Sequence, residues 1–391
     1  MEACPDDPGS REGRLVIPFM AKEISLYVHL PFCRKKCPYC SFFVLPYSKE
    51  SVDLLLKALT LHLEQISPQL TGRNLVSVYF GGGTPSVVSS DFLQSLVKKI
   101  RELPVAFDPA LEWTLEANPE DVSKEFAALL FSLGIHRVSL GVQSFVDKEL
   151  VFLGRSANKG HALTAIENLL DANITNISID LIFELMDQTK GDLIETLKVV
   201  KDLPITHLSL YNLMIEEGSK FYRSKEVLEK KRPPDASCLE MLDTAVATLE
   251  SYGFDRYEIS AFCKQNQRSR HNTGYWTARE FVGIGPSAWS FFGQKRSQCT
   301  KNLNKYFTAL ACNKDPIEYE EELDTALLQK EQAGLLLRLK EGIPKTPLLA
   351  PSIEQAIDKL IHKGWIQQGE NSYVLTEAGK KFYDLVQMEL L

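Results

Sequence analysis

The chain has 391 residues and a formal net charge of −7 at pH 7, from 44 Lys and Arg against 51 Asp and Glu. Hydrophobic residues make up 44% and charged residues 24%, as in soluble globular proteins, which excludes disordered and fibrous chains. The chain lacks the basic excess of nucleic-acid-binding proteins, and its apolar runs are shorter than the roughly 20 residues that cross a bilayer. We therefore expect no nucleic-acid partner and no membrane span.

The beginning of the chain predicts an extension without regular structure. Residues 1–22 include Glu2, Asp6, Asp7 and Glu12 but neither the apolar core of a secretory signal nor the acid-poor character of a transit peptide. We expect this segment to be disordered and the protein to be cytoplasmic. In that reducing compartment its eight cysteines are expected to be thiols and not disulfides.

Short apolar and β-branched runs alternate with amphipathic segments from residue 23 to about residue 215, which is the pattern of βα units around a parallel sheet. The expected strands are residues 24–29, 76–80, 113–116, 137–142, 176–182 and 207–213. Six such units are fewer than the eight of a closed barrel. We therefore predict an α/β fold with a partial (β/α)6 barrel over residues 23–255, with a doubly wound sheet as the alternative.

The amphipathic segments between and after these strands predict helices. Residues 91–103 place their apolar side chains on one helical face after a cap at Ser89 or Ser90, and residues 236–252 predict a further helix. Residues 256–320 form a connecting region, of which residues 260–286 are rich in loop-forming and aromatic residues.

The last part of the chain, residues 321–391, predicts a helical, winged-helix-like domain. Helical periodicity covers residues 325–339 and 353–362, and residues 365–368 and 372–376 predict a small β-hairpin around residues 369–371. Many winged helices bind DNA, but this one lacks a basic stripe, so the fold alone assigns no function to it.

Three cysteines follow the first expected strand in a C-x3-C-x2-C spacing: Cys33, Cys37 and Cys40. Thiolates at this spacing are able to hold three corners of an iron–sulfur cube and to leave the fourth iron without a protein ligand. Zinc is the alternative, but a closed zinc site takes four ligands and no fourth Cys or His lies at a suitable spacing. The spacing therefore predicts a [4Fe–4S] cluster with one open iron.

Glycine-rich or polar residues also follow the next four expected strands. Gly81-Gly82-Gly83-Thr84 follows the second strand, and Glu116, Gln143 and Asp180 stand at the ends of the third, fourth and fifth. Each has an ordinary explanation as a turn or loop cap. Because the carboxyl ends of parallel strands meet at one face of a barrel, four in succession predict a ligand site beside the cysteines.

Together these motifs resemble the radical S-adenosylmethionine superfamily, and within it the oxygen-independent coproporphyrinogen III dehydrogenases, from about residue 24 to residue 385. The matching segments also include Gly141-Val-Gln143-Ser-Phe and Gly154-Arg155. The resemblance implies that S-adenosylmethionine is bound by Tyr27, Tyr39, Gly82 and Glu116. It assigns a second S-adenosylmethionine position, whose use depends on the branch of the family, to Gly83, Thr84, Gln143, Arg155 and Asp180.

Two features indicate the branch. The dehydrogenases carry a fourth cysteine two places after the third, where this chain has Phe42. The sequence His271-Asn-Thr-Gly-Tyr275-Trp276 is similar to the HNxxYW motif of the HemW-type heme chaperones. That resemblance implies binding of heme and its delivery to heme-accepting proteins, with a homodimer as a further expectation. Oxygen-independent coproporphyrinogen III oxidase activity is the alternative function.

Within the HNxxYW motif, His271 is the candidate heme ligand, because an imidazole is able to bind heme iron while Tyr275 and Trp276 offer flat walls to a porphyrin. The ordinary interpretation is a structural histidine. Arg34, Lys35 and Lys36 are likewise either a solvated basic turn or a docking site for an acidic, flavodoxin-like electron donor.

Some residues depart from the family pattern. Where relatives have Gly-Leu-Pro-Gly-Gln-Thr after the fifth strand, this chain has Glu184, Met186 and Asp187 in place of the glycines and the proline. Ala261 replaces an expected Asn, which removes a side-chain hydrogen-bonding group. These changes predict an altered turn and a retuned pocket.

Overall fold

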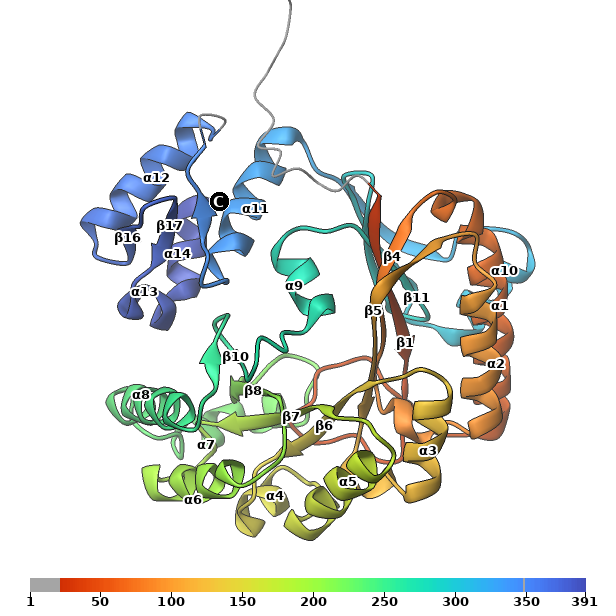
Figure 1. The fold of residues 1–391 in the computed structure, drawn as a ribbon, viewed down its shortest axis with the longest axis horizontal. Helices are drawn as coiled ribbons and strands as arrows, with labels where there is room; N and C mark the ends of the chain where they lie inside the picture. The colour runs from red at the N-terminus through yellow and green to blue at the C-terminus, as the bar shows by residue number, and fades with distance from the viewer. Residues whose placement is uncertain (1–21, 347–348) are drawn as a thin grey trace, which may run out of the picture. The chain divides into compact units, whose positions relative to one another are not determined.

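The larger part of the protein is built on a sheet whose centre is parallel. In this computed structural model, which describes residues 22–346 and 349–391, six parallel strands pair in the order β1, β4, β5, β6, β7 and β8. Their bounds are Glu23–Leu30, Asn74–Gly82, Ala106–Ala117, Arg137–Gln143, Asn176–Phe183 and His207–Asn212. These are the six strands that the sequence predicts. The first and last of them do not pair with each other, so the predicted partial, open barrel is confirmed (Figure 1).

The sheet extends beyond these six strands at both edges. On one side β11 (Phe281–Ile284) runs parallel to β1, and β12 (Trp289–Phe292), β13 (Lys295–Cys299) and β14 (Ile317–Glu322) continue antiparallel. On the other side β10 (Ala261–Cys263) and β9 (Asp255–Arg256) follow β8. The segment expected to be loop-rich therefore holds β10, the short helix α9 (Arg270–Trp276) and β11.

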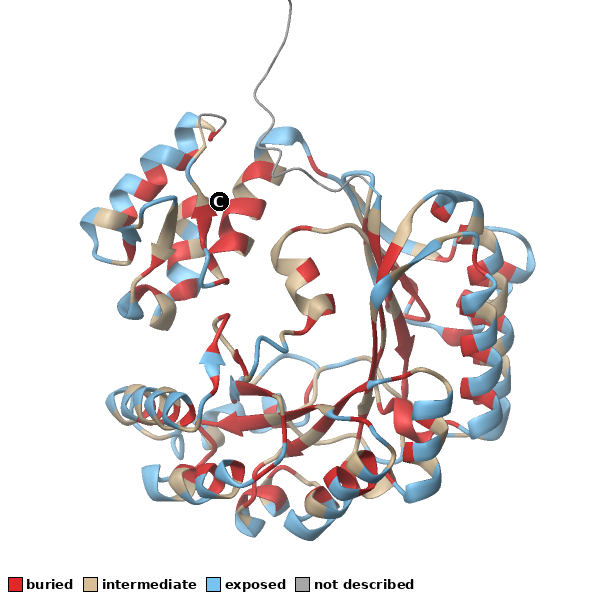
Figure 2. Cartoon of the chain, in the orientation of Figure 1, coloured by how far each residue is buried: buried red, intermediate tan, exposed pale blue. Residues whose placement is uncertain are grey.

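Helices cover the outer face of the barrel (Figure 1). They are α1 (Lys49–Leu70), α2 (Ser90–Arg101), α3 (Lys124–Ser132), α5 (Lys159–Asp171), α6 (Lys190–Lys201) and α8 (Asp235–Ser251). The predicted cap of α2 is present, since the Ser89 side chain accepts a hydrogen bond from the Phe92 backbone amide. Figure 2 shows that these helices bury one face and expose the other, as their sequence periodicity predicts.

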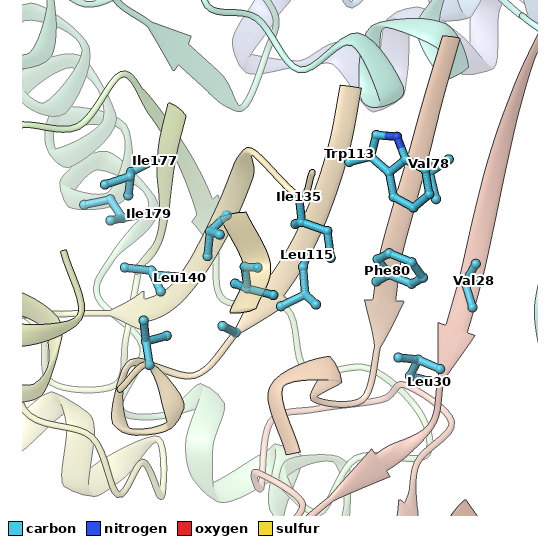
Figure 3. Close-up of a cluster of buried hydrophobic side chains, with 14 of the residues drawn as sticks. Val28, Leu30, Val78, Phe80, Trp113, Leu115, Ile135, Leu140, Ile177 and Ile179 are labelled. Atoms are coloured by element: carbon cyan, nitrogen blue, oxygen red, sulfur yellow. The ribbon is translucent and has the colours of Figure 1, made fainter. Parts of the chain in front are cut away.

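Alternation along the strands separates an apolar face from a polar one. Val28, Leu30, Val78 and Phe80 are buried in the hydrophobic core that the strands share with the outer helices (Figure 3). The residues between them point the other way, into the barrel, and are mostly polar. Hydrogen bonds join Ser77 to Ser25, Tyr79 to Glu116, Ser139 to Asp180, and Ser178 to His207. A polar interior of this kind is costly unless its groups bind each other or a ligand.

The chain divides into two units, which we describe separately. One comprises Lys22–Tyr275 and Arg279–Glu322, and the other comprises Trp276–Ala278 and Leu323–Leu391. The second unit has the helix, strand, helix and hairpin order of a winged helix, as predicted. Its elements are α11 (Thr325–Leu337), β15 (Ile343–Pro344), α12 (Pro351–His362), β16 (Ile366–Gln368), β17 (Ser372–Leu375), α13 (Glu377–Lys381) and α14 (Tyr383–Leu390). The sequence did not indicate β15, α13 or α14. Except for Lys22, the extension expected over residues 1–22 lies outside the described residues.

Candidate functional site

The cysteine loop and the glycine-rich turn are joined by backbone hydrogen bonds at the carboxyl ends of β1 and β4. The Gly83 amide donates to the Leu30 carbonyl at 2.9 Å and the Thr84 amide to the Phe32 carbonyl at 2.8 Å. A side chain at Gly83 would place its Cβ 2.7 Å from the Phe32 carbonyl oxygen, so only glycine allows this approach. The glycines therefore hold the turn directly against the strand-to-cysteine connection.

The three cysteines lie in the loop that this turn supports. All three are half-buried free thiols. The Cys33 sulfur lies 3.2 Å from the Thr84 hydroxyl, and Arg155 donates to the Cys37 sulfur at 3.7 Å. Burial raises the pKa of the Cys33 and Cys40 thiols, so a nearby positive charge such as iron is needed to hold them as thiolates at neutral pH.

The donor set fits an iron–sulfur cluster. Three thiols share one loop, and each would bind a different iron of a cube, which spreads the ligands over several metal ions. The spacing of the thiols therefore suits a cluster that takes one thiolate at each of three corners.

The cysteines open onto a cavity of about 420 Å³ at the same end of the barrel. Eight of the nine residues assigned to S-adenosylmethionine line it together with the three cysteines: Tyr39, Gly82, Gly83, Thr84, Glu116, Gln143, Arg155 and Asp180. The exception is Tyr27, which does not line the cavity. Its hydroxyl instead lies 3.0 Å from Nδ1 of His29, whose Nε2 lies 3.1 Å from the Phe43 carbonyl oxygen.

Further cavity residues were not singled out from the sequence. Gly141 lies within a motif already noted and Asn118 follows Glu116 by two residues. Both bind Arg155, whose Nη2 donates to the Asn118 side chain at 2.8 Å and to the Gly141 carbonyl at 2.6 Å. Ser139 lies two residues before Gly141 on β6, so both are on the face of the strand that points into the barrel. The alternation of inward and outward side chains along a strand would have predicted Ser139 from the position of Gly141. No such pattern in the sequence predicts the lining residues after β8.

Two partly buried carboxyl groups, Glu116 at the end of β5 and Asp180 on β7, line this cavity. Burial raises the pKa of Glu116 to about 7, against the hydrogen bonds that its side chain accepts from the Tyr79 hydroxyl at 2.8 Å and the Gly82 amide at 3.2 Å. Burial also raises the pKa of Asp180, which accepts from the Ser139 hydroxyl at 3.3 Å. A cationic ligand entering the cavity would favour the ionised form of both groups.

The raised pKa of Glu116 predicts a specific effect of pH on stability. Because the pKa rises from 4.5 in the unfolded chain to about 7, the side chain contributes stability that is present below pH 4.5 and lost as the pH rises through 7. We therefore expect the difference in free energy of unfolding, Glu116→Gln minus wild type, to increase by roughly 3 kcal/mol between pH 4.5 and pH 7.

Urea unfolding of both proteins without cofactors, at several pH values, measures this difference. Taking the difference between the two proteins cancels the contribution of the buried histidines, which titrate in the same range with the opposite sign. A difference that does not vary with pH would show that Glu116 titrates normally.

The structure places the HNxxYW motif at the other end of the barrel interior, away from the cysteine loop. The Glu112 carboxylate accepts hydrogen bonds from the backbone amides of Arg270 and His271, each at 2.9 Å, and so binds the start of α9. Ser77 lies near the beginning of β4, and its hydroxyl is 2.9 Å from Nδ1 of His271. The Tyr275 hydroxyl is 2.8 Å from Nε2.

His271 thus has a protein partner at both ring nitrogens and is only 1% exposed. Its ring also stacks on Tyr79 at a centroid distance of 4.8 Å. Burial lowers the pKa of His271 to about 3, so the ring is neutral at physiological pH. Binding of heme iron to His271 would require one of these hydrogen bonds to break, and the geometry instead supports a structural role.

The altered turn after β7, residues 184–187, has the backbone conformation that glycine favours. Glu184 and Asp187 have φ values of 60° and 58°, the left-handed region, where the relatives have glycine. Glu184 is held by an ion pair with Arg232 at 3.0 Å, and the Asp187 amide donates to the Lys231 carbonyl at 2.8 Å. Contacts from the segment before α8 therefore stabilise this turn without its glycines.

Met186 and Ala261 do not reach the cavity. Met186 is buried in a small apolar cluster behind the cavity wall, which also includes the lining residues Ile182 and Leu213. Ala261 is buried in β10 opposite Ser209. None of these four departures from the family pattern lines the cavity.

Among the described residues, no helix combines the length and the apolar character needed to span a membrane. This agrees with the absence of long apolar runs in the sequence.

Known proteins resemble this chain in sequence and in fold. A sequence model of the Radical SAM superfamily matches residues 27–200. The chain is 31% identical over 377 residues to a protein of Mycobacterium tuberculosis named heme chaperone HemW, which covers 96% of both chains. A protein of the same name from Bacillus subtilis is 30% identical over 366 residues, covering 91% of this chain and 96% of the relative.

Among solved structures, coproporphyrinogen III oxidase (HemN) from Escherichia coli shares the fold with a TM-score of 0.83. It covers 94% of this chain and 90% of that chain at 21% sequence identity. The sequence relatives extend over both structural units, and the superfamily match spans the cysteine loop and strands β4 to β7. The chain therefore belongs to the HemW-type family of radical S-adenosylmethionine proteins.

Proposed function

We propose that this protein binds heme and delivers it to heme-requiring proteins, and that it carries one [4Fe–4S] cluster together with S-adenosylmethionine. The observation that carries this proposal is the match, over 96% of both chains, to a relative named heme chaperone HemW. Membership of the superfamily implies the cluster and S-adenosylmethionine. The cavity that joins Cys33, Cys37 and Cys40 to the residues assigned to S-adenosylmethionine supports it.

The residues of the cavity suggest how the cofactors would be held. The three thiolates would bind three irons of the cluster, whose fourth iron supplies an open coordination position. Glu116 and Asp180 provide negative charge for a cationic ligand, and the Gly82–Gly83 backbone allows a close approach. Arg155 fixes the wall beside Cys37 through its bonds to Asn118 and Gly141.

We place this function in the cytoplasm. The support is chemical: all the described cysteines are free thiols, and a cluster held by thiolates requires that they stay reduced.

The alternative activity gives the sharpest test. The HemN-type dehydrogenases are expected to have a fourth cysteine where this chain has Phe42, so we expect no conversion of coproporphyrinogen III. The purified protein, reconstituted with iron and sulfide and reduced, would be incubated with S-adenosylmethionine and coproporphyrinogen III while vinyl products are followed by chromatography. E. coli HemN under the same conditions is the positive control. Measurable protoporphyrinogen IX from this chain would overturn the chaperone proposal in favour of the oxidase.

A further inference from the structure

Two segments meet at the mouth of the cavity. One is the end of the cysteine loop, where the Ser41 hydroxyl donates a hydrogen bond to the Glu216 carboxylate. The other is the segment after β8, whose Phe221 amide donates to the Pro38 carbonyl at 2.9 Å. These two bonds join the segments that carry Phe42 and Met214, and both of these side chains line the cavity.

The side chains at this mouth are unusually exposed for apolar residues. Phe42 is 65% exposed, Met214 is 57% exposed and Tyr211 is 44% exposed, and all three line the cavity. None of them is needed to bind a cluster through the three thiols. A group of exposed aromatic and thioether side chains around one cavity is typical of a surface that binds an apolar ligand.

The same mouth carries positive charge. Lys35 and Lys36 line the cavity, and the Lys36 ammonium group donates to the Phe42 carbonyl at 3.0 Å. Arg34, by contrast, is engaged in an ion pair with Asp121. The one acidic side chain among these mouth residues, Glu216, already accepts the hydrogen bond from Ser41. Two ammonium groups beside an aromatic face suit a flat apolar molecule that bears carboxylates at its edge.

We propose that the mouth of this cavity is an iron porphyrin site, with Phe42 and Tyr211 packed against the macrocycle, Met214 as an axial ligand through its sulfur, and Lys35 and Lys36 at the propionates. Thioether sulfur is an established ligand type for heme iron, and flat aromatic rings pack well against a porphyrin. The proposal rests on the proposed function and deepens it, because it gives heme a site on the side of the barrel opposite to His271.

The test is a heme titration of the reconstituted full-length protein and its variants. For Met214→Ala we expect loss of the thioether-to-iron absorption band and about tenfold weaker binding, and for Phe42→Ala about three- to tenfold weaker binding. Met388→Ala and Phe131→Ala are matched controls, because these side chains are 73% and 51% exposed but do not line the cavity. Both controls should bind heme as the wild type does.

A second arm tests the propionate contacts. The wild type should prefer heme over heme dimethyl ester, and the double change of Lys35 and Lys36 to Ser should remove that preference while iron and sulfide content stay at the wild-type level. If the double variant instead keeps the preference for heme and differs from the wild type only in slower reduction by flavodoxin, the turn is a donor-docking site and the propionate assignment is wrong.

The outcomes separate the two levels of the proposal. A wild-type protein that binds no heme would overturn the proposed function itself. Heme binding by the wild type with an unchanged spectrum and affinity in Met214→Ala and Phe42→Ala would leave the function standing and overturn this site.

Discussion

Alanine at any one of Cys33, Cys37 or Cys40 is expected to abolish the iron–sulfur cluster. A cube whose fourth iron already lacks a protein ligand would be left with two thiolates, too few to hold it stably. Iron and sulfide analysis after anaerobic reconstitution should fall from about four of each per chain to near zero, and the visible charge-transfer absorption should disappear.

The matched control for these variants is Cys312→Ala. Cys312 is an exposed free thiol that does not line the cavity, so its loss should leave the cluster intact. Retention of about four irons in any of the three loop variants would show that the cluster is held elsewhere or that the metal site is of another kind.

Replacement of His271 by Ala is expected to destabilise the barrel unit strongly. The change removes a buried ring, its stack on Tyr79 and its bonds to Ser77 and Tyr275, and it leaves a cavity in the polar interior. Losses of this kind lower the free energy of unfolding by about 3 to 5 kcal/mol, which urea unfolding measures.

His136→Ala is the control, because His136 is an exposed histidine of the same unit and should change stability by less than about 0.5 kcal/mol. The heme spectrum distinguishes the structural role of His271 from a ligand role. A variant of normal stability whose heme absorption is shifted would establish His271 as a heme ligand and contradict the structural assignment.

The parallel core of the fold could be predicted because its signals are local. Each of the six central strands is an apolar, β-branched run bounded by turn residues. The cap at Ser89 and the regular spacing of apolar residues likewise predict α2. The strands that extend the sheet lack such signals. β14 is largely exposed and rich in glutamate, β13 has no apolar residue except its terminal Cys299, and β11 is a run of only four residues.

The residues of the candidate site that stand at strand ends could also be predicted from the sequence. Residues at strand ends, such as Glu116 and Asp180, converge because parallel strands bring their carboxyl ends to one face. Tyr27 and His271 are different, because their surroundings depend on partners far away in the sequence. Only the folded chain shows that the Ser77 hydroxyl lies beside the imidazole of His271. It also shows that the Tyr27 hydroxyl lies beside the His29 imidazole and that Tyr27 does not line the cavity.

The same distinction explains Phe42 and Met214. The sequence identifies Phe42 only as a replacement for a fourth cysteine, and Met214 only as a residue after a strand. They lie together at the cavity mouth because the fold brings two segments that are remote in the chain side by side, where the Ser41–Glu216 and Phe221–Pro38 hydrogen bonds join them.

Heme transfer is the measurement that tests the central claim most directly. The heme-loaded protein would be mixed with the apo form of a heme-requiring enzyme from the same cells, in the presence of excess apomyoglobin, which captures any heme released into solution. The account predicts that the loaded protein restores enzyme activity despite the scavenger, whereas an equal amount of free heme does not. Activation by the loaded protein that the scavenger suppresses as fully as it suppresses activation by free heme would contradict the chaperone function.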